Sequence, residues 1–449
     1  MSLKRRDFLK LTGVGGLGAL LSWGRGQAAT GLSGKYLNLI PATAAPIPKP
    51  NGPRVVIVGA GWSGLTIAKY LKKYNAGIDV VLIDKRSGFM SSPVSNLWVS
   101  GLLNLDFLMH SFHRPAVNNK YYYLNAWVVD VDRAKRIVHT TEGTVNYDYL
   151  VLAPGIDYDY SRLVGDDTET EARLRQEYPG GFIPMGEHLY LKEKVEAFEK
   201  GVFLLTCPGG NYRCLPAPYE RTCMIADYFK REGIPGKVVL LDENPDITIK
   251  KDGFHSAFDE LYKDYVEYYP SSPIVKIDLD KKVVETELGD QIQFADAAIY
   301  PRVRGAKLVE QVGLAKDGIN KGEANIDVFT YQAVDDEHVF IAGDARPMAF
   351  SKSGNTANSE GKFVAKVIAN RIAGKETPWE SPTTICYSAV AGEPLRAIKV
   401  QAGYAYNKEK GQFQFANAST MELWDTDKGT QAGQALLEWA KGLYRDMLT

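Results

Sequence analysis

Arg54-Val55-Val56-Ile57-Val58-Gly59-Ala60-Gly61-Trp62-Ser63-Gly64 is the stretch of sequence that decides the fold of this chain. The apolar, β-branched run that follows Arg54 predicts a buried parallel strand. The glycines Gly59, Gly61 and Gly64 form a Gly-x-Gly-x-x-Gly turn that opens a predicted helix ending at about Tyr74. Such a turn lets the backbone approach a pyrophosphate at the N-terminus of a helix, where the helix dipole favours negative charge.

A second predicted strand, residues 79–83, leads directly into Asp84, which lies 20 residues beyond Gly64. Strand, glycine turn, helix, strand and acid together make one βαβ unit, and this context makes the motif far more specific than the glycines alone. Asp84 stands where an acid bonds the ribose hydroxyls in such units. The segment therefore predicts a dinucleotide-binding domain.

The chain leaves this domain after residues 150–155 and returns to it with a predicted strand that ends in Gly343-Asp344. An acid at that place lies against the ribitol of a flavin, so the two motifs together favour FAD over NAD. Lys352, nine residues past Gly343, is predicted to place a cation near the pyrimidine end of the flavin. A solvated surface charge is the alternative for Lys352.

A second dinucleotide-type unit spans residues 202–242, again in the order strand, helix, strand. Its turn, residues 207–214, lacks the glycine fingerprint. Pro208 and the bulky Tyr212 fill the space where the phosphates of a nicotinamide cofactor rest. We therefore expect that this unit binds no NAD(P)H.

The composition and the cysteine pattern argue against several classes of protein. The chain has 449 residues, with 45% hydrophobic and 24% charged residues, which are ordinary globular values. A formal net charge of −1 argues against the broad basic face of a nucleic-acid-binding protein. The sequence has no Cys-x-x-Cys-His, so any c-type haem must belong to another chain. The cysteine spacing fits neither a zinc site nor an iron–sulfur cluster, so no metal is expected.

Residues 1–29 carry the three parts of a twin-arginine signal peptide. Lys4-Arg5-Arg6 is followed by a glycine-rich apolar run, and Gln27-Ala28-Ala29 offers small residues for cleavage. Twin-arginine export predicts a periplasmic location, where a disulfide can persist. Residues 30–53 are rich in proline and small residues, which is typical of a linker or a strap on the surface.

Several short segments together carry a resemblance to a known family. They are Tyr212-Arg213-Cys214 with Pro218-Tyr219-Glu220-Arg221, Lys352-Ser353-Gly354 with Ala357-Asn358-Ser359, and Cys386-Tyr387-Ser388. With these segments the chain resembles the flavoprotein subunit of flavocytochrome c sulfide dehydrogenase over nearly its whole length. That family belongs to the two-dinucleotide-domain disulfide oxidoreductases, the group that includes the sulfide:quinone oxidoreductases.

The resemblance implies an α/β fold with two Rossmann-like domains, similar to glutathione reductase, and a smaller C-terminal interface domain. The FAD-binding domain is expected to comprise residues 54–164 and 305–376. Residues 165–304 are expected to form the second Rossmann-like domain, without a NAD fingerprint. Residues 377–449 are expected to form the C-terminal domain.

The resemblance also implies the chemistry. The cysteines that match Cys214 and Cys386 form a redox disulfide beside the flavin, and the glutamate that matches Glu220 lies near them. Sulfide is then the expected substrate, and a c-type cytochrome subunit is the expected partner. The four cysteines alone permit three pairings, and a purely structural Cys214–Cys386 disulfide is the alternative. Cys207 and Cys223 are expected to be buried free thiols or paired with each other, and a carboxylate that only complements the helix dipole is the alternative for Glu220.

One position departs from the pattern of the family. Well-known members tether the flavin through a cysteine just before a Leu-Ser-Asn step, and Ser92 occupies that place here. A hydroxyl is a much poorer nucleophile than a thiolate, so we expect non-covalent FAD. Ser353 and Gly354 are expected to bind the cofactor as well.

Two other functions remain open. The first is a sulfide:quinone oxidoreductase, and the second is an accessory flavoprotein that serves a protein partner in sulfur oxidation. Residues 435–448 show apolar side chains at helical spacing, as a membrane-facing helix would. The acidic and basic residues of this segment balance, however, so it lacks the basic character of a helix that lies on a membrane. We therefore expect the segment to dock on protein, and we do not expect membrane association.

Overall fold

The computed structural model describes residue 41 and residues 43–449, so the predicted signal peptide lies outside the described residues. The described end of the predicted linker runs against the first domain. Ala45 N donates a hydrogen bond of 3.0 Å to Thr144 O, and Arg54 Nη2 donates one of 2.6 Å to Pro48 O. Residues 45–48 are therefore fixed to the first domain by hydrogen bonds to Thr144 and Arg54.

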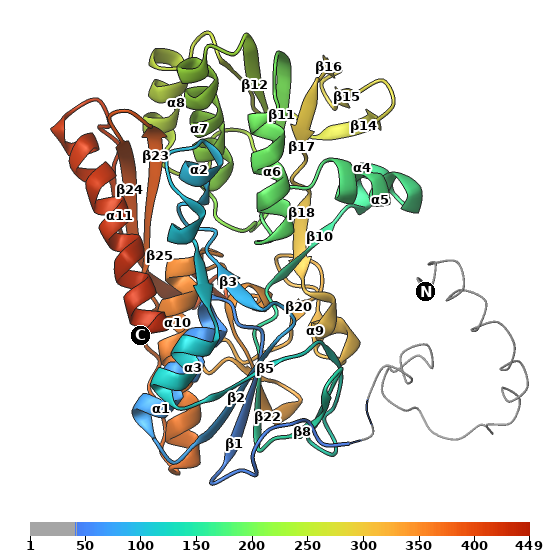
Figure 1. Cartoon of the computed structure of the whole chain (residues 1–449), viewed down its shortest axis with the longest axis vertical. Coiled ribbons are helices and arrows are strands. Elements are labelled where there is room, and N and C mark those ends of the chain that lie inside the picture. Colours follow the sequence, from blue (N-terminus) through green and yellow to red (C-terminus); the bar gives the residue numbers. More distant parts are fainter. Residues whose placement is uncertain (1–40, 42) are drawn as a thin grey trace, which may run out of the picture.

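A six-stranded sheet forms the core of the lower half of the molecule (Figure 1). Its strands, in spatial order, are β21 (Gln332–Ala333), β22 (Asp336–Ile341), β9 (Tyr149–Leu152), β1 (Arg54–Val58), β2 (Asp79–Asp84) and β5 (Tyr122–Asn125). All five residues of β1 are buried. Parallel strands flank both of its edges, and the helix that follows it in the chain packs against it. The helices α1 (Trp62–Tyr74) and α10 (Gly354–Ile372) pack against each other beside the sheet.

The upper half of the molecule contains a parallel sheet of four strands, in the order β13 (Val266–Tyr269), β12 (Gly236–Asp242), β11 (Gly201–Cys207) and β17 (Asp296–Ala298). Helix α7 (Ala217–Glu232) packs on β11 and β12, and most of its residues are buried. Apart from the edge strand β21, which is antiparallel to β22, both sheets are parallel. The fold is therefore the two-dinucleotide-domain fold that the sequence predicts.

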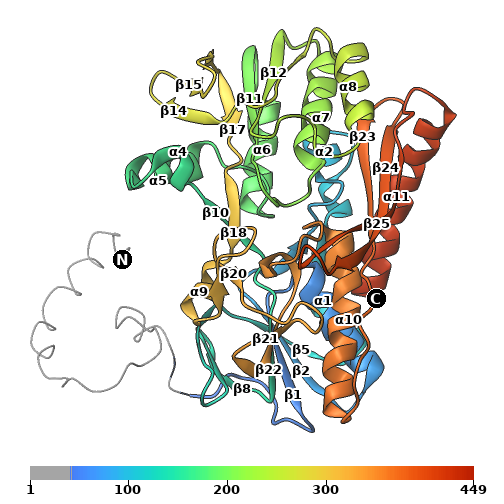
Figure 2. The ribbon, with the colours of Figure 1, turned by 180° about the vertical axis from the view of Figure 1, so that it is seen from behind.

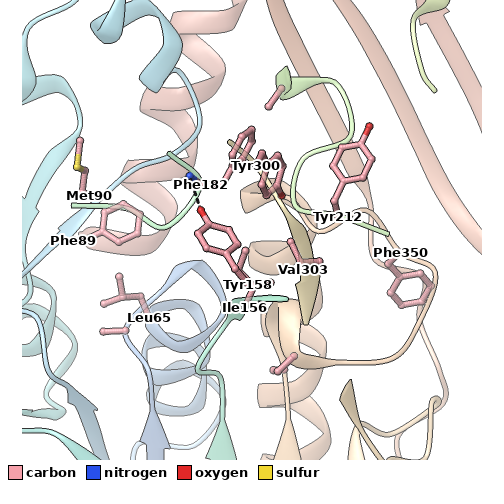
Figure 3. Close-up of a cluster of buried hydrophobic side chains, with 14 of the residues drawn as sticks. Leu65, Phe89, Met90, Ile156, Tyr158, Phe182, Tyr212, Tyr300, Val303 and Phe350 are labelled. Carbon is pink, nitrogen blue, oxygen red and sulfur yellow. Dashed lines mark hydrogen bonds between the residues drawn. The ribbon is translucent and has the colours of Figure 1, made fainter. Parts of the chain in front are cut away.

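An antiparallel pair of strands, β10 (Ile156–Asp159) and β18 (Arg302–Gly305), joins the two halves. Buried aromatic side chains fill this junction (Figure 3). The rings of Phe182 and Tyr300 stack with centroids 3.7 Å apart, and Phe182 N donates to Tyr158 Oη at 3.1 Å. The junction thus links both sheets, and it contacts the loop that carries Cys214, because Arg213 N donates a hydrogen bond of 3.0 Å to Tyr300 Oη.

The C-terminal segment lies along one side of both halves (Figures 1 and 2). It consists of the antiparallel strands β23 (Thr384–Ala391), β24 (Arg396–Asn407) and β25 (Gln412–Met421), followed by helix α11 (Asp427–Leu448). β23 contacts α7, and α11 packs on β24 and α1. The C-terminal helix therefore docks on the chain's own body, and it begins at Asp427, earlier than the sequence predicts.

The remaining elements are shorter. The helices are α2 (Ser95–Val99), α3 (His113–Asn119), α4 (Ser161–Val164), α5 (Thr168–Glu177), α6 (Gly186–Glu196), α8 (Lys251–Glu260), α9 (Lys307–Gln311) and the 3₁₀ turns η3 (Leu105–Phe107) and η4 (Gly343–Ala345). The strands are β3 (Gly88–Met90), β4 (Met109–Ser111), β6 (Val128–Asp132), β7 (Ile137–Thr140), β8 (Gly143–Asn146), β14 (Ile274–Asp278), β15 (Val283–Thr286), β16 (Gln291–Gln293), β19 (Ala315–Lys316) and β20 (Glu323–Ala324). Within the described part of the chain, no helix combines the length and the hydropathy of a membrane span, and no cluster of three His, Cys, Asp or Glu side chains is arranged to hold a metal ion.

Candidate functional site

Two cysteines from remote parts of the chain meet where β23 packs on α7. Cys214 lies just before α7, and Cys386 is the third residue of β23. Both side chains are partly exposed free thiols, and they are hydrogen-bonded to each other. The structure therefore brings together the two residues that the sequence singles out. The disulfide between them stays a prediction.

The backbone of Cys214 is held by the flavin-domain segment that precedes α10. Cys214 N donates to Lys352 O at 2.9 Å, and Ala217 N donates to Cys214 O at 2.8 Å. Cys214 adopts a left-handed conformation with φ of 59°, which costs free energy for a residue with a side chain. These two hydrogen bonds fix the strained residue at the contact between the two domains.

The two thiols differ in acidity. The hydrogen bond that Cys214 donates lowers the pKa of Cys386 to about 6, with Lys250 and Ser388 adding to this effect against the cost of burial. The same hydrogen bond, together with burial and the charge on Cys386, raises the pKa of Cys214 well above its ordinary value. Cys386 is therefore the more acidic thiol of the pair.

Glu220 lies in the first turn of α7 and its side chain is buried beside the cysteines. One of its oxygens accepts a hydrogen bond of 3.1 Å from Ala389 N, and the Asn96 side chain donates to the carboxylate as well. Burial, followed by the charge on Cys386, raises the pKa of Glu220 to about 7. Glu220 is thus both a helix-start carboxylate and a group that can exchange a proton near neutral pH.

Sequence reasoning missed two residues of this site, Lys250 and Ser388. The Lys250 ammonium donates to Ser388 Oγ at 2.6 Å and to Cys386 O at 3.4 Å. Lys250 precedes α8 and has a left-handed backbone, with no periodic pattern to mark it. Ser388 follows Cys386 by two residues on the same strand, so strand alternation places it on the same face and could have revealed it.

The fingerprint turn fits a dinucleotide. A Cβ on Gly59 would lie 2.2 Å from Ala153 O, and one on Gly64 would lie 1.9 Å from Gly59 O, so both positions require glycine. A Cβ on Gly61 would meet no atom within 4 Å, which leaves open space where a pyrophosphate approaches the backbone. The buried Ser63 hydroxyl beside it has no hydrogen-bond partner in the structure. These features suit the pyrophosphate of a dinucleotide cofactor.

Asp84 organises the other end of this turn. Its carboxylate accepts a hydrogen bond of 2.6 Å from Ala60 N in the fingerprint and a two-pronged contact from the Arg86 guanidinium at 2.8 and 3.0 Å. Burial alone would raise the pKa of Asp84, but these donors hold it below its ordinary value. Asp84 therefore carries a negative charge at the place predicted for ribose recognition.

The Gly-Asp segment is tied to the Cys214 loop. Asp344 Oδ2 accepts a hydrogen bond of 2.6 Å from Arg213 Nε. Gly343 has a φ of 71°, and its N–H donates to Glu360 Oε1 at 2.7 Å. The acid predicted to bind the ribitol thus remains in place, with one oxygen engaged by the residue next to the cysteine.

Lys352 is buried, so the alternative of a solvated surface charge is wrong. Its ammonium contacts Glu323 at 3.0 Å, Asp344 O at 2.6 Å and Arg346 O at 3.2 Å. All three N–H donors are therefore used within the protein. The structure gives Lys352 a role in fixing the Gly-Asp segment, and its direct contact with a flavin stays a prediction.

Three further predicted residues surround the N-terminus of α10. Ser353 caps this helix, because its Oγ accepts from Thr356 N at 3.3 Å. A Cβ on Gly354 would lie 2.9 Å from the ring of Pro93, so the helix N-terminus lies next to the segment that contains Ser92. Ser92 itself is partly exposed. Residues predicted from separate segments therefore converge at one helix N-terminus, which favours a negative or polar group of a cofactor.

The second domain uses its own side chains where a nicotinamide cofactor would bind. Tyr212 is fully buried in the turn, and its hydroxyl contacts Cys207 Sγ at 3.3 Å. Asp242, at the end of β12, accepts hydrogen bonds from Tyr219 Oη at 2.7 Å and Tyr268 Oη at 2.9 Å. The acid that would contact a ribose is thus occupied.

The two other cysteines, Cys207 and Cys223, are buried free thiols. This is the first of the two states that the sequence left open for them. Burial raises the pKa of both thiols well above the ordinary value. Buried neutral thiols are poor nucleophiles, so the reactive sulfurs of the described chain are those of Cys214 and Cys386.

Two family models match this chain. Residues 53–176 match pyridine nucleotide-disulphide oxidoreductase, and residues 188–301 match the central part of the flavoprotein chain of sulfide dehydrogenase [flavocytochrome c]. The first match covers the glycine fingerprint, and the second covers the Cys214 loop and α7.

Similar proteins match most of this chain. The type II NADH:quinone oxidoreductase of Staphylococcus haemolyticus is 26% identical over 72% of this chain and 83% of its own length. The mitochondrial sulfide:quinone oxidoreductase of Dictyostelium discoideum is 24% identical, over 72% of each chain. Among solved structures, the sulfide:quinone oxidoreductase of Aquifex aeolicus superposes with a TM-score of 0.67 at 16% identity, over 88% of this chain and 92% of that one.

Proposed function

We propose that this chain, a flavoprotein of the disulfide oxidoreductase group whose central domain is of the sulfide dehydrogenase type, oxidises sulfide at Cys214 and Cys386. We further propose that it works in the periplasm and passes its electrons to a c-type cytochrome. The observation that carries the proposal is the convergence of the two thiols with Glu220, next to the Gly-Asp segment of the flavin domain.

FAD is the cofactor that the first domain fits. The fingerprint turn with Ser63, the Asp84 carboxylate and the Gly-Asp segment would hold its phosphates, ribose and ribitol in turn. When bound, FAD supplies a two-electron acceptor that can pass electrons on singly. The protein's part would be to place the cysteine pair against it, and the Cys214 N–H···O Lys352 hydrogen bond of 2.9 Å, which ties this cysteine to the first domain, supports that role.

The sulfur chemistry balances on the cysteine pair alone. In the oxidised pair, hydrosulfide attacks one sulfur of the Cys214–Cys386 disulfide. The S–S bond between the cysteines breaks, a new S–S bond forms to the incoming sulfur, and the other cysteine leaves as a thiolate. The substrate sulfur is oxidised and the cysteine pair is reduced by two electrons.

Glu220 is the group that accepts the proton released during this exchange. Its pKa of about 7 lets it hold or release a proton at neutral pH. Hydrosulfide and a cysteine persulfide both carry an S–H proton that must leave as sulfur chains grow. Glu220, within the same buried cluster as both sulfurs, is the group that receives it.

The two candidate functions, a sulfide dehydrogenase and a sulfide:quinone oxidoreductase, differ in their electron acceptor. The match to the sulfide dehydrogenase flavoprotein chain supports a cytochrome, and the similarity to sulfide:quinone oxidoreductases supports a quinone. Purification without detergent tests this point, because co-purification of a haem-carrying chain that the reduced flavoprotein reduces supports the cytochrome. Rapid reduction of a quinone in detergent, with no effect of a cytochrome, would favour the second candidate.

The decisive experiment follows flavin absorbance in a stopped-flow instrument after sulfide is added to the flavin-loaded protein. We expect rapid bleaching in the wild type and a loss of at least about a hundredfold in rate for Cys386→Ser, because the exchange needs both sulfurs. Cys223→Ala is the control and should bleach within about threefold of the wild-type rate. A flavin that sulfide leaves oxidised but a protein partner reduces would instead identify an accessory flavoprotein.

The attachment of FAD is a separate proposal. With Ser92 at the position of the tethering cysteine, we propose that FAD is held non-covalently. Acid precipitation of the purified protein should then release the yellow colour into the supernatant. Ser92→Cys is the matched variant, and it should retain colour in the pellet if residue 92 faces the 8-methyl group. Colour in the pellet of the wild type would refute non-covalent binding.

A further inference from the structure

Lys250 is unusual among the buried lysines of the described chain. Lys194 contacts Asp296 and Lys352 contacts Glu323, so each of these ammonium groups has a carboxylate partner. Lys250, with only 2% of its surface exposed, has none within the described residues, and its hydrogen bonds go to Ser388 Oγ and Cys386 O. A buried charge without a counter-ion is costly, so an anion is expected beside it.

The groups around Lys250 identify that anion. Ser388 Oγ accepts from the Lys250 ammonium at 2.6 Å, and Ser388 lies two residues beyond Cys386 on β23, so strand alternation places its hydroxyl on the same face as the Cys386 sulfur. The titratable groups that face Cys386 are Cys214 and Glu220 from α7 and its preceding loop, and Lys250 from the start of α8. The Lys250 charge acts on both Glu220 and Cys386, but its hydrogen bonds go to the Cys386–Ser388 segment, which favours the Cys386 sulfur as the site of the balancing charge.

We propose that Lys250 is a positioning residue that acts through Ser388 to hold Cys386 as a thiolate, so that Cys386 is the sulfur that leaves when the cysteine pair is opened. Hydrosulfide then attacks Cys214, the Cys214–Cys386 bond breaks, Cys214 gains the persulfide sulfur and Cys386 takes the electron pair of the broken bond. The sulfur that gives the more stable thiolate is the better leaving group. The catalytic meaning of this assignment rests on the proposed function.

Alkylation of the reduced protein tests the role of Lys250 without sulfide or flavin. Iodoacetamide labelling over a pH series, with the Cys214 and Cys386 peptides separated by mass spectrometry, gives the pH midpoint of each thiol. In the wild type, Cys386 should react at a lower pH than Cys214. In Lys250→Met the midpoint of Cys386 should move up, with a fall of about three- to tenfold in its rate at pH 7, because less of it is thiolate.

Two further variants make the result specific. Lys251→Met is the matched control, because Lys251 is the next residue but is exposed and pairs with Asp246. Ser388→Ala removes the hydroxyl between Lys250 and Cys386, and it should raise the same midpoint even if Lys250→Met does not fold. An unchanged Cys386 midpoint in Ser388→Ala, or in a folded Lys250→Met, would overturn the proposal, as would an equal shift in Lys251→Met.

The direction of attack has its own readout. Oxidised protein is mixed with one equivalent of sulfide and quenched at once with excess alkylating agent, and the added sulfur is located by peptide mass. Persulfide on Cys214 is expected, whereas persulfide confined to Cys386 would reverse the assignment. If sulfide fails to reduce the flavin while the alkylation midpoint still depends on Lys250, the proposed function fails and the role of Lys250 stands.

Discussion

The Arg213 guanidinium donates a hydrogen bond of 2.6 Å to the carboxylate of Asp344, although the two residues belong to different domains. Arg213 directly precedes Cys214, and Asp344 belongs to the segment predicted to bind the flavin ribitol. The backbone N–H of Cys214 also donates a hydrogen bond to Lys352 O. Two consecutive residues, Arg213 and Cys214, are therefore bonded to the other domain. The position of the reactive sulfur is therefore set by the flavin domain.

Removing the guanidinium should destabilise the fold. Arg213→Met leaves the mostly buried Asp344 carboxylate without its partner, which we expect to lower the free energy of unfolding by about 3 kcal/mol. Urea unfolding measures this change. Arg162→Met is the control, because Arg162 is exposed and lies 3.8 Å from Glu243, and it should have little effect. Equal losses in both variants would contradict the prediction.

Glu220 should make stability depend on pH. Burial and the charge on Cys386 raise its pKa from 4.5 to about 7, so between these values the folded protein binds more protons than the unfolded chain. The free energy of unfolding therefore falls as pH rises through this window, by at most about 3 kcal/mol. Compared with Glu220→Gln under reducing conditions, the wild type should show the steeper fall between pH 5 and 7.

The exposed residue Glu232, at the end of the same helix, supplies the control for that comparison. Glu232→Gln should retain the slope of the wild type over the same pH range. If Glu220→Gln keeps that slope as well, Glu220 does not titrate in this window.

Nicotinamide cofactors should not reduce this protein. Tyr212 fills the turn of the second domain, and Asp242 is held by two tyrosine hydroxyls. We expect NADH and NADPH to leave the flavin oxidised over a period in which sulfide bleaches it completely. Absorbance spectra of the flavin-loaded protein check this outcome, and bleaching by NADH at a comparable rate would show that the second domain opens.

The docking of α11 should depend on Asp446. Its carboxylate accepts from Tyr70 Oη at 2.7 Å and Asn358 Nδ2 at 3.0 Å, and it pairs with Lys362 at 2.8 Å. Asp446→Asn should lower stability by about 1 to 2 kcal/mol, because charged acceptors make the stronger hydrogen bonds. Hydrogen exchange of the α11 amides should rise in this variant and stay unchanged in Glu438→Gln, whose pair with Lys441 is exposed.

The sequence allowed the frame of the fold to be predicted because its signals are local. The first predicted strand coincides with β1, and the glycine turn opens α1 at Trp62 as expected. Apolar periodicity and glycine positions depend on neighbouring residues only, so one sequence suffices to interpret them. The start of α11 was missed because its first turns, from Asp427, are polar and carry a weaker pattern.

The site was only partly predictable because side-chain partners are set by tertiary packing. Cys214, Cys386 and Glu220 were found through a resemblance, and the structure brings them together. Lys250 was missed because a lone lysine before a helix has no pattern that distinguishes it from a surface charge. The engagement of Lys352 with Glu323 likewise joins residues that no sequence motif connects.

The placement of Cys386 on a strand near the end of the chain has a consequence for biosynthesis. A ribosome that has made residues 1–383 has already released Cys214 and α7, but their partner strand does not yet exist. The reactive pair is thus completed only when the last part of the chain has been made, and until then Cys214 lacks the sulfur with which it is predicted to pair. A chain cut short before β23 would carry Cys214 without Cys386, so it would lack the proposed redox pair even if both dinucleotide-type domains had formed.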